Sequence, residues 1–430
     1  MPLSNQPIKG TIDWFPEEFI VRKYIFDTWR KVCLSYGYQE YLSPLLESAE
    51  VYRAKSGEDI GGKELMVFTD QGGRELAIRP EMTPSVTRMI SQVYDSAPKP
   101  IRYFSIANFM RNEKPQRGRN REFWQLNVDL FGSDVLNADL EIMQLALDLM
   151  LAFNPPERSF SLCVNSRKLI DAVLDEVLRI NPKAYPQTRV EIVRTLDKWE
   201  KLSKVDCQAR LREIGLDSIQ TETLNVFMSC QNISDFITKL PDLADNPGVQ
   251  ELKSVIEKLK ELGYGNWVEF KPNVIRGFDY YDGIVFEVFD NHPENNRALF
   301  GGGRYNGLAE IFGSKSFPAV GFAPGDETTK LFLESWEMLE QVKNESKIEL
   351  YYLPILDSKL VKETQALAKK MRQAGKNVIL GLEEQKLNKA LEYANKQGID
   401  YLIILGRDEK DKGVYKIKDM KSGEEQEIVL

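Results

Sequence analysis

The stretch RNEKPQRGRNREFWQLNVD, residues 111–129, decides how the fold of this chain is interpreted. Apolar and polar residues alternate in IRYFSIANFMRNE, which leads into it, and in EFWQLNVDLFG, which continues beyond it. The segment KPQRGRNR between these runs is basic and contains a glycine. Two alternating runs joined in this way predict antiparallel strands with a long basic loop between them.

The loop and the strand ends concentrate positive charge, with five basic residues and one acidic residue between Arg111 and Arg121. Guanidinium groups bind phosphate oxygens in a planar, bidentate way. The candidates for such contacts are Arg111, Arg117, Arg119 and Arg121. Charge alone favours a solvated hairpin tip, so the order of the residues has to decide between the two interpretations.

Polar side chains alternate along the second strand. Gln125, Asn127 and Asp129 occupy every other position and therefore point to one face. A polar row of this kind is unusual for a buried strand, and Phe123 offers a ring on which a flat base could stack.

The N-terminal flank predicts several elements. Residues 17–36 carry apolar side chains at helical spacing with acids near the start, which predicts a long amphipathic helix. GYQEYLSPLLE predicts a strand broken at Pro44, because proline cannot donate to a central ladder. ELMVFTD and ELAIRPE around QGGR predict a hairpin, while PSVTRMISQVYD and LNADLEIMQLALDLMLAF predict helices.

The pattern of apolar and charged residues changes twice in the C-terminal flank. Residues 167–264 show Leu and Ile at helical spacing among many charges, which predicts an inserted helical module. Strand patterns resume in WVEFKPNVIRGFDYYDGIVFEVFD and ALFGGGRYNGL, and PAVGFAPGDETTKLFLESWE ends as a helix. In residues 347–430, IELYYLPI, KNVILGL and DYLIILG alternate with helical segments, which predicts a small, mostly parallel α/β domain.

Length and composition exclude several classes of protein. A chain of 430 residues calls for two or three domains, and no apolar run approaches the roughly 18 residues of a membrane span. The N-terminus MPLSNQPIKGTIDWFP lacks the pattern of a secretory signal, so a cytoplasmic protein is expected. GxGxxG and GxxxxGK[ST] motifs do not open any βα unit, so Rossmann and P-loop nucleotide binding lack support.

The sequence offers few histidines and cysteines that could bind a metal or act as a nucleophile. The single histidine, His292, lies in an Asn/Pro-rich loop, which argues against a Ser-His-Asp hydrolase or a histidine-ligated metal. The cysteines form no CxxC pair, so neither zinc nor disulfides are indicated: Cys33, Cys163, Cys207 and Cys230.

The net charge of −8 argues against a dedicated nucleic-acid binder, because phosphate neutralisation needs clustered Lys and Arg. Residues 347–430, however, hold 16 Lys/Arg and 14 Asp/Glu, so this tail carries +2 and the remainder −10.

The order of residues in 111–129 resembles motif 2 of class II aminoacyl-tRNA synthetases, and its form RxExPQxGRxREFxQ is similar to the histidine-specific branch. Further resemblances follow in order along nearly the whole chain. The first 47 residues resemble motif 1 with its proline at Pro44, IRPEMTPS resembles the histidine-binding loop, and IRGFDYYDG and GGGRYNGL resemble two signatures of histidyl enzymes. Residues 347–430 resemble the anticodon-binding domain of this group.

The resemblance implies an α+β fold, in which a class II antiparallel-sheet catalytic domain with a helical insertion is followed by a C-terminal α/β anticodon-binding domain. The implied boundaries are 1–166 and 265–338 for the catalytic domain, 167–264 for the insertion and 347–430 for the anticodon-binding domain. Motif 1 also implies a homodimer.

The implied activity is ATP-dependent activation of L-histidine to histidyl-adenylate and its transfer to the 3′ end of histidine tRNA. ATP and Mg²⁺ are implied as a substrate complex and not as tightly held cofactors. A histidine pocket must neutralise an ammonium, bind a carboxylate and read an imidazole. The residues that the resemblance assigns are Glu81, Thr83 and Gln125 for the ammonium, Asp129 and Tyr281 for the imidazole, and Tyr280 and Tyr305 as further pocket residues.

The resemblance also assigns the ATP site. The residues are Arg111 on the α-phosphate, Glu113 near the adenine, Arg119 near the γ-phosphate and Phe123 under the base. Arg276 is assigned to the histidine-binding set, where it supplies positive charge beside the α-phosphate and the substrate carboxylate. Arg111 and Arg276 are the implied catalytic residues, because they stabilise charge that grows during an in-line displacement. Gln116 and Arg117 are implied to approach the tRNA acceptor end.

Motif 3 departs from the family pattern, which resembles GFAxGxER. Here PAVGFAPGDETTK places Thr328 where an arginine stacks on the adenine, and Pro324 alters the approach. Lys330, another nearby cation, or Phe123 alone are the candidates to replace that arginine.

The departure keeps other hypotheses open. One is a catalytically silent relative that binds histidine as a regulatory subunit, like that of ATP phosphoribosyltransferase, although such subunits lack the C-terminal domain. A sensor of tRNA-like elements would keep the tail. Synthetases for glycine, threonine or proline would lack RGFDYY.

Overall fold

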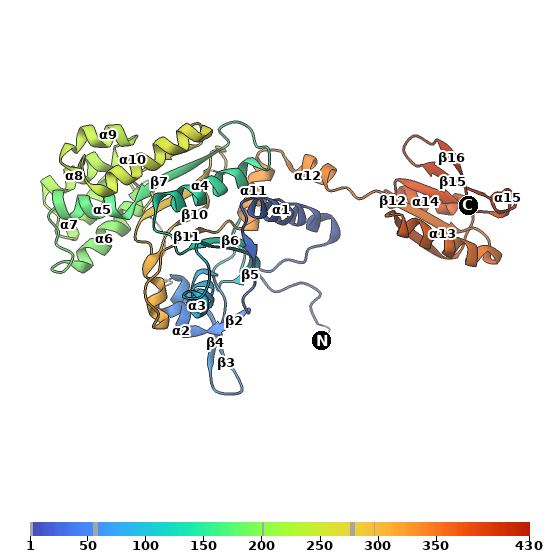
Figure 1. Ribbon diagram of the computed structural model, residues 1–430, viewed down its shortest axis with the longest axis horizontal. Helices are drawn as coiled ribbons and strands as arrows, with labels where there is room; N and C mark the ends of the chain where they lie inside the picture. The colour runs from blue at the N-terminus through green and yellow to red at the C-terminus, as the bar shows by residue number, and fades with distance from the viewer. Residues whose placement is uncertain (1–2, 55–58, 200–201, 276–279, 296) are drawn as a thin grey trace. The chain divides into compact units, whose positions relative to one another are not determined.

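The computed structural model describes residues 3–54, 59–199, 202–275, 280–295 and 297–430. The chain forms two compact units, Met1–Val342 and Lys343–Leu430, whose elements are coloured along the chain in Figure 1. Within the described ranges, every helix is too short or too polar to cross a bilayer.

The first unit is built around an eight-stranded sheet with the order β1-β5-β6-β11-β10-β9-β7-β8. Pairing is antiparallel from β5 through to β7, and one parallel pair closes each edge. This confirms the predicted α+β class with an antiparallel sheet. The strands are β1 (Gln39–Glu40), β5 (Ile101–Met110), β6 (Glu122–Phe131), β7 (Phe160–Ser166), β8 (Val268–Phe270), β9 (Ile284–Asp290), β10 (Ala298–Arg304) and β11 (Ala319–Phe322).

The hairpin of β5 and β6 is the longest pairing of this sheet, and it confirms the two strands predicted around the basic loop. Its register runs from Ile101 opposite Phe131 to Met110 opposite Glu122. Because side chains alternate along a strand, Gln125, Asn127 and Asp129 share one face, while Leu126 and Val128 are buried on the other.

Helices from distant parts of the chain pack together on the apolar face of the sheet around β6. They are α1 (Pro16–Ser35), α4 (Leu136–Leu151) and α11 (Asp326–Ser335), and α1 contacts both of the others. Ile25 and Trp29 of α1 join Leu126 and Val128 in one apolar core. Burying each large side chain of this kind contributes about 1.5–3 kcal/mol, so this face holds the hairpin rigidly.

A smaller sheet carries the segments on both sides of the Glu81 turn. Its order is β2-β4-β3, with β2 (Leu46–Ser48), β3 (Met66–Thr69) and β4 (Glu75–Ile78), beside α2 (Ala49–Arg53) and α3 (Thr83–Val93). The predicted hairpin is the antiparallel pair β3–β4. The strand predicted across Pro44 is divided between two sheets, because β1 pairs with β5 and β2 pairs with β4.

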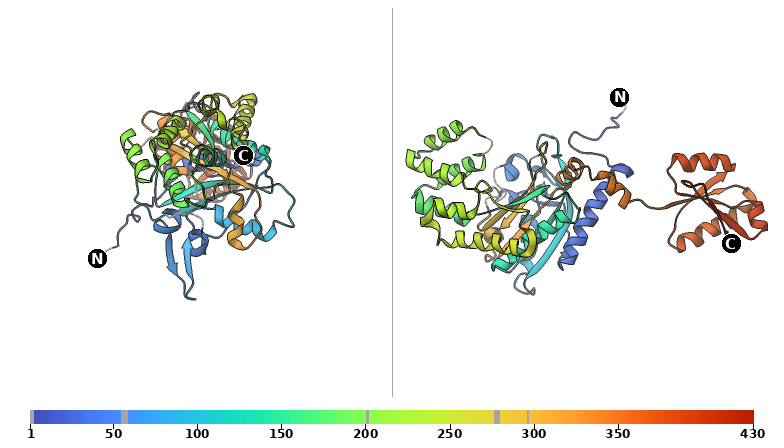
Figure 2. Two further views of the ribbon diagram at one scale, coloured as in Figure 1. Left: turned by 90° about the vertical axis from the view of Figure 1, so that its left-hand side faces the viewer. Right: turned by 90° about the horizontal axis from the view of Figure 1, so that it is seen from above.

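The helices after β7 belong to the same compact unit as the sheet. They are α5 (Arg167–Ala172), α6 (Pro186–Asp197), α7 (Lys204–Glu213), α8 (Ser218–Met228), α9 (Ile233–Lys239) and α10 (Pro247–Leu259). Leu252 and Val255 of α10 pack into the core shared with α4 and β7. Figures 1 and 2 show these helices gathered at the end of the unit opposite α1.

The second unit is a five-stranded sheet with the order β13-β12-β14-β15-β16. Strands β12 (Leu350–Ile355), β13 (Asn377–Glu384) and β14 (Tyr401–Ile404) are parallel and alternate with α13 (Val361–Gln373) and α14 (Leu387–Lys396), as predicted. The hairpin of β15 (Val414–Asp419) and β16 (Glu425–Val429) adds two antiparallel pairings. The sheet is therefore less parallel than the sequence pattern indicated.

Candidate active site

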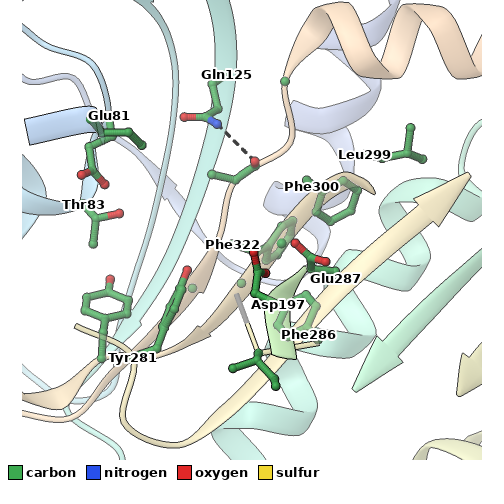
Figure 3. Close-up of a pocket in the computed structure, with 18 of the residues that line it drawn as sticks. Glu81, Thr83, Gln125, Asp197, Tyr281, Phe286, Glu287, Leu299, Phe300 and Phe322 are labelled. Atoms are coloured by element: carbon green, nitrogen blue, oxygen red, sulfur yellow. Dashed lines mark hydrogen bonds between the residues drawn. The ribbon is translucent and has the colours of Figure 1, made fainter. Parts of the chain in front are cut away.

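A cleft of about 1260 Å³ opens over the polar face of β6. Its wall combines charged residues of the β4–α3 turn and the β5–β6 hairpin with aromatic residues of β9, β10 and β11. Figure 3 shows two sides of this cleft. One side carries the polar residues Glu81, Thr83, Gln125 and Tyr281. The other side carries Phe286, Phe300, Phe322, Glu287 and Asp197.

The turn between β4 and α3 positions Glu81. Arg79, two residues earlier, is buried and donates to the carbonyl oxygens of Asn108 at 2.9 Å and Ser43 at 2.8 Å, so it holds the turn against β5. The buried Glu81 carboxylate accepts the hydroxyl of Tyr280 at 3.0 Å. Burial, followed by the charge of Glu81, raises the pKa of Tyr280 well above its ordinary value, so this phenol remains a donor.

Gln125 lies on β6 between this carboxylate and the β11–α11 turn. Its amide nitrogen donates to the carbonyl oxygen of Ala323 at 3.2 Å, as Figure 3 shows. Thr83, the first residue of α3, lines the same cleft. The structure thus brings together the three residues predicted for an ammonium.

Asp129 lies deeper on the same strand and is buried. The hydroxyl of Tyr305 donates to its Oδ1 at 2.5 Å, while Oδ2 lacks a hydrogen-bond partner among the described residues. Burial raises the pKa of Asp129 to about 7, and the hydrogen bond from Tyr305 opposes that rise in part. Tyr281 lines the same part of the cleft, and burial likewise raises the pKa of its phenol.

The approach of β11 to Asp129 requires a glycine. A Cβ atom on Gly321 would overlap the Asp129 carboxylate and would lie 2.5 Å from the carbonyl oxygen of Val128. Gly302 faces the same restriction, because its Cβ would lie 2.5 Å from that of Phe322. The glycine-rich strand therefore makes room for the pocket floor.

Arg111 and Phe123 form the opposite end of the cleft. The Arg111 guanidinium is 5.0 Å from the Phe123 ring, and its Nε donates to the carbonyl oxygen of Pro80 at 3.0 Å. Glu113 and the more exposed Arg119 line the cleft beside them, with 3.8 Å between their charged groups. These residues can present guanidinium groups and a flat ring to a nucleotide.

The two residues predicted to contact the tRNA acceptor end lie outside the cleft wall. Gln116 and Arg117 are exposed at the tip of the β5–β6 loop and are not part of the cleft wall. Arg297 donates to the carbonyl oxygen of Arg117 at 2.9 Å and so ties the loop to the strand edge. Arg276 lies outside the described residues.

Thr328, in the motif 3 segment, lines the cleft and is held by hydrogen bonds to the main chain. The hydroxyl of Thr328 donates to the carbonyl oxygens of Leu299 at 3.0 Å and Gly325 at 3.1 Å. Lys330 does not take the place of an arginine there, because its ammonium lies 5.3 Å from the ring of Trp14 and outside the cleft wall. This excludes Lys330, as placed, from the candidates to stack on an adenine.

Sequence reasoning missed a third wall of the cleft. Asp197 and Arg194 of α6 face it together with Glu287 of β9. A weak signal was available for Glu287, since an acid inside the apolar run IVFEVFD calls for an explanation. The α6 residues had no local signal, because only the tertiary packing brings that helix to the sheet.

An antiparallel sheet whose arginine-bearing hairpin and buried carboxylate line one cleft is the architecture of a class II aminoacyl-tRNA synthetase. A family model described as histidyl-tRNA synthetase matches residues 10–326, and one described as anticodon binding domain matches residues 349–430. The chain belongs to the histidyl-tRNA synthetase family.

Individual relatives agree with this. The histidine–tRNA ligase of Leptospira biflexa serovar Patoc is 38% identical over 98% of this chain and 94% of its own length. That of Thermococcus kodakarensis is 35% identical over 98% and 95%. A crystal structure of histidyl-tRNA synthetase from Nostoc sp. PCC 7120 matches with a TM-score of 0.81 at 23% identity, covering 100% of this chain and 97% of that one, a likeness in fold.

Proposed function

We propose that this chain activates L-histidine with ATP and transfers the histidyl group to the 3′ end of histidine tRNA. The observation that carries the proposal is that Glu81, Gln125 and Asp129 line one cleft together with Arg111 and Arg119. A pocket for an amino acid and a set of phosphate-binding groups are thus contiguous, as adenylate formation requires.

In the first step the histidine carboxylate attacks the α-phosphorus of ATP, and diphosphate leaves. The carboxylate is already ionised, so the protein contributes position and positive charge. Arg111 and Arg276 stabilise the charge on the α-phosphate, and Arg119 binds the γ-phosphate. Charge stabilisation of this kind is worth about 3–4 kcal/mol per group removed.

Within the pocket, Glu81 neutralises the histidine ammonium, with Thr83 and Gln125 as neutral acceptors. Asp129 and Tyr281 read the imidazole, while Tyr280 and Tyr305 hold the two carboxylates in place. Support comes from the hydrogen bonds of Tyr280 to Glu81 and of Tyr305 to Asp129.

ATP enters as its Mg²⁺ complex, in which phosphate oxygens hold the metal. Its adenine stacks on Phe123, beside Glu113. The position of the Phe123 ring at the cleft wall, under the Arg111 guanidinium, supports this stacking on the adenine.

In the second step the terminal ribose hydroxyl of the tRNA attacks the histidyl carbonyl, and AMP leaves. The exposed Gln116 and Arg117 approach the acceptor end, and residues 347–430 bind the anticodon. The match of an anticodon-binding family model to residues 349–430 supports the second assignment. Residues 1–166 with 265–338, and residues 167–264, would then be the catalytic domain and its insertion.

The chain acts as a homodimer in this proposal. Exposed apolar residues lie in the segment that leads into β2, at the start of β2 and in β3: Leu42, Pro44, Leu45, Leu46 and Phe68. These exposed apolar residues would supply part of the association surface.

A regulatory, catalytically silent relative is the second candidate. It is disfavoured because this chain carries the second unit, Lys343–Leu430, and keeps Arg111 and Arg119 in the cleft.

Histidine-dependent exchange of pyrophosphate into ATP tests the proposal. The purified chain should exchange with histidine and not with glycine, threonine or proline. Arg276→Ala should abolish exchange while the dimer, measured by sedimentation velocity, stays intact. Histidine binding without any exchange by the wild type would instead establish the regulatory function.

A further inference from the structure

Arg297 directly precedes β10, and the proposed reaction gives it no task. Its guanidinium donates to the carbonyl oxygen of Arg117 at 2.9 Å, so it contacts the tip of the β5–β6 loop. The two residues are 180 positions apart in the chain. This contact is therefore made by the tertiary structure and not by the loop itself.

The segment that carries Arg297 is anchored by Asp290, the last residue of β9. The buried carboxylate of Asp290 accepts the main-chain N–H of His292 at 2.9 Å and the side-chain amide of Asn295 at 2.6 Å. The indole N–H of Trp336 donates to the same carboxylate at 3.0 Å. The main-chain N–H of Asp290 donates to the carbonyl oxygen of Arg297 at 3.0 Å. Arg297 thus projects from a segment that is well held by hydrogen bonds.

The loop tip is a β-turn, and Arg297 bonds to its central carbonyl group. The N–H of Arg119 donates to the carbonyl oxygen of Gln116 at 2.8 Å, and Gly118 has a φ of +74°. A positive φ at the third position is characteristic of a type II turn, in which the central peptide is flipped relative to a type I turn. A flip to type I would turn the Arg117 carbonyl oxygen away from Arg297. The hydrogen bond therefore stabilises one of two orientations of this peptide.

The base of the loop is held by other contacts. The main-chain N–H of Arg121 donates to the carbonyl oxygen of Gly10 at 2.8 Å. At the tip, a Cβ on Gly118 would lie 2.6 Å from the Leu331 side chain and 2.8 Å from the Arg297 guanidinium, so the turn packs against both. Removing the guanidinium would loosen the tip and leave the base in place.

We infer that Arg297 is a positioning residue for the transfer step, which holds the loop tip in the conformation that presents Gln116 and Arg117 to the acceptor end of the tRNA. The inference deepens the proposed function and rests on it. A flip of the central peptide leaves the flanking residues of a turn nearly in place, so Arg119 stays at the cleft and histidine activation continues. A loop that spends only a fraction of its time in the binding conformation lowers the apparent affinity by that fraction. Arg297 therefore affects the KM for tRNA and not adenylate formation.

The experiment measures the two steps separately in Arg297→Ala. The KM for histidine tRNA in aminoacylation should rise about 3- to 10-fold, as expected for one hydrogen bond, while kcat stays within about twofold. Histidine-dependent pyrophosphate exchange, which needs no tRNA, should also stay within about twofold. Arg297→Met keeps an unbranched side chain and removes the donor, so it should reproduce the result if the alanine variant folds poorly.

Limited proteolysis tests the contact without any substrate. Trypsin cleaves the bond between Arg117 and Gly118, and cleavage requires this segment to leave its folded conformation. Mass spectrometry of the fragments should show cleavage at this bond about 3- to 10-fold faster in Arg297→Ala than in the wild type. Arg74→Ala is the matched control, because it removes an equal charge from an exposed turn of the same unit. It should leave the cleavage rate and the KM for tRNA unchanged.

Unchanged cleavage after Arg117 would overturn the inference, and together with a raised KM it would make Arg297 a direct contact to the tRNA. Equal losses in exchange and aminoacylation would also overturn it, because a general structural role affects both steps. A wild type that charges no tRNA would refute the proposed function, while the cleavage rates would still decide whether Arg297 holds the loop tip.

Discussion

Asp129 is a carboxyl group held out of water at the centre of the sheet, with 4 % of its surface exposed and one oxygen bonded to Tyr305. Burial raises its pKa to about 7 from an ordinary 3.8. Such a group is set to pair with a ligand N–H, and the free protein bears the cost of its charge.

Asp129→Asn should reveal that cost. The folded pKa lies above the unfolded one, so the stability contributed by the protonated carboxyl is complete at low pH and is lost as the pH rises through about 7. Asparagine stays neutral, so the variant should gain on the order of 1–2 kcal/mol over the wild type at pH 8 and clearly less near pH 5. Urea unfolding of the ligand-free proteins measures this.

Burial raises the pKa of Asp326 to about 7 as well, but Asp326 titrates in both proteins and cancels from the difference. The same gain at both pH values would contradict the titration of Asp129 in this range.

Thr328 stands at the position where the motif 3 pattern has an arginine. Its hydroxyl is bonded to main-chain oxygens and Lys330 lies over Trp14, so neither residue can stack on an adenine in this arrangement. Thr328→Arg should lower the KM for ATP by about 2- to 30-fold, because a guanidinium over a flat ring is worth about 0.5–2 kcal/mol. Pyrophosphate exchange at varied ATP measures it.

Thr328→Val serves as the control, since it removes the hydroxyl and adds no charge. An unchanged KM in the arginine variant would mean that another group already fills the site.

At the scale of elements, the pocket depends on how closely β10 and β11 approach β6. Gly321→Ala would place a methyl group against the Asp129 carboxylate and 2.5 Å from the Val128 carbonyl oxygen. We expect a loss of about 1–3 kcal/mol in the free energy of unfolding and at least about tenfold weaker histidine binding. Denaturation and calorimetry provide the two values.

Gly307→Ala is the matched substitution, because a Cβ there meets no atom within 4 Å. If both variants behaved alike, close approach of β11 would not be the cause.

At the scale of the whole molecule, the proposed homodimer would use the exposed leucines in and before β2 as part of its interface. Leu42→Arg should convert the dimer to a monomer, because a charged side chain would be desolvated in the interface. Sedimentation velocity detects the change, and the free energy of unfolding of each protomer should stay within about 0.5 kcal/mol for an exposed site.

Leu382→Arg is the comparison, since Leu382 is exposed in the second unit. A wild-type chain that sediments as a monomer would refute the homodimer, and dissociation by Leu382→Arg would move the interface elsewhere.

Local patterns in the sequence determined most of the elements of this protein. Helix α1, the β5–β6 hairpin and the alternating α/β segments of the tail follow from side-chain periodicity over a few residues. The ordered motifs likewise indicated the family and placed Glu81, Gln125 and Asp129 on one site. The β15–β16 hairpin was missed although VYKIKD alternates.

Only the tertiary structure decided which of these residues meet. It assigned Arg79 to the turn and left Glu81 in the cleft, paired Tyr305 with Asp129 across the sheet, and placed Lys330 outside the cleft wall. It also divided the Pro44 segment between two sheets. The physical reason is that periodicity reports on neighbours along the chain, whereas burial and hydrogen bonding depend on groups that the chain brings together from far apart.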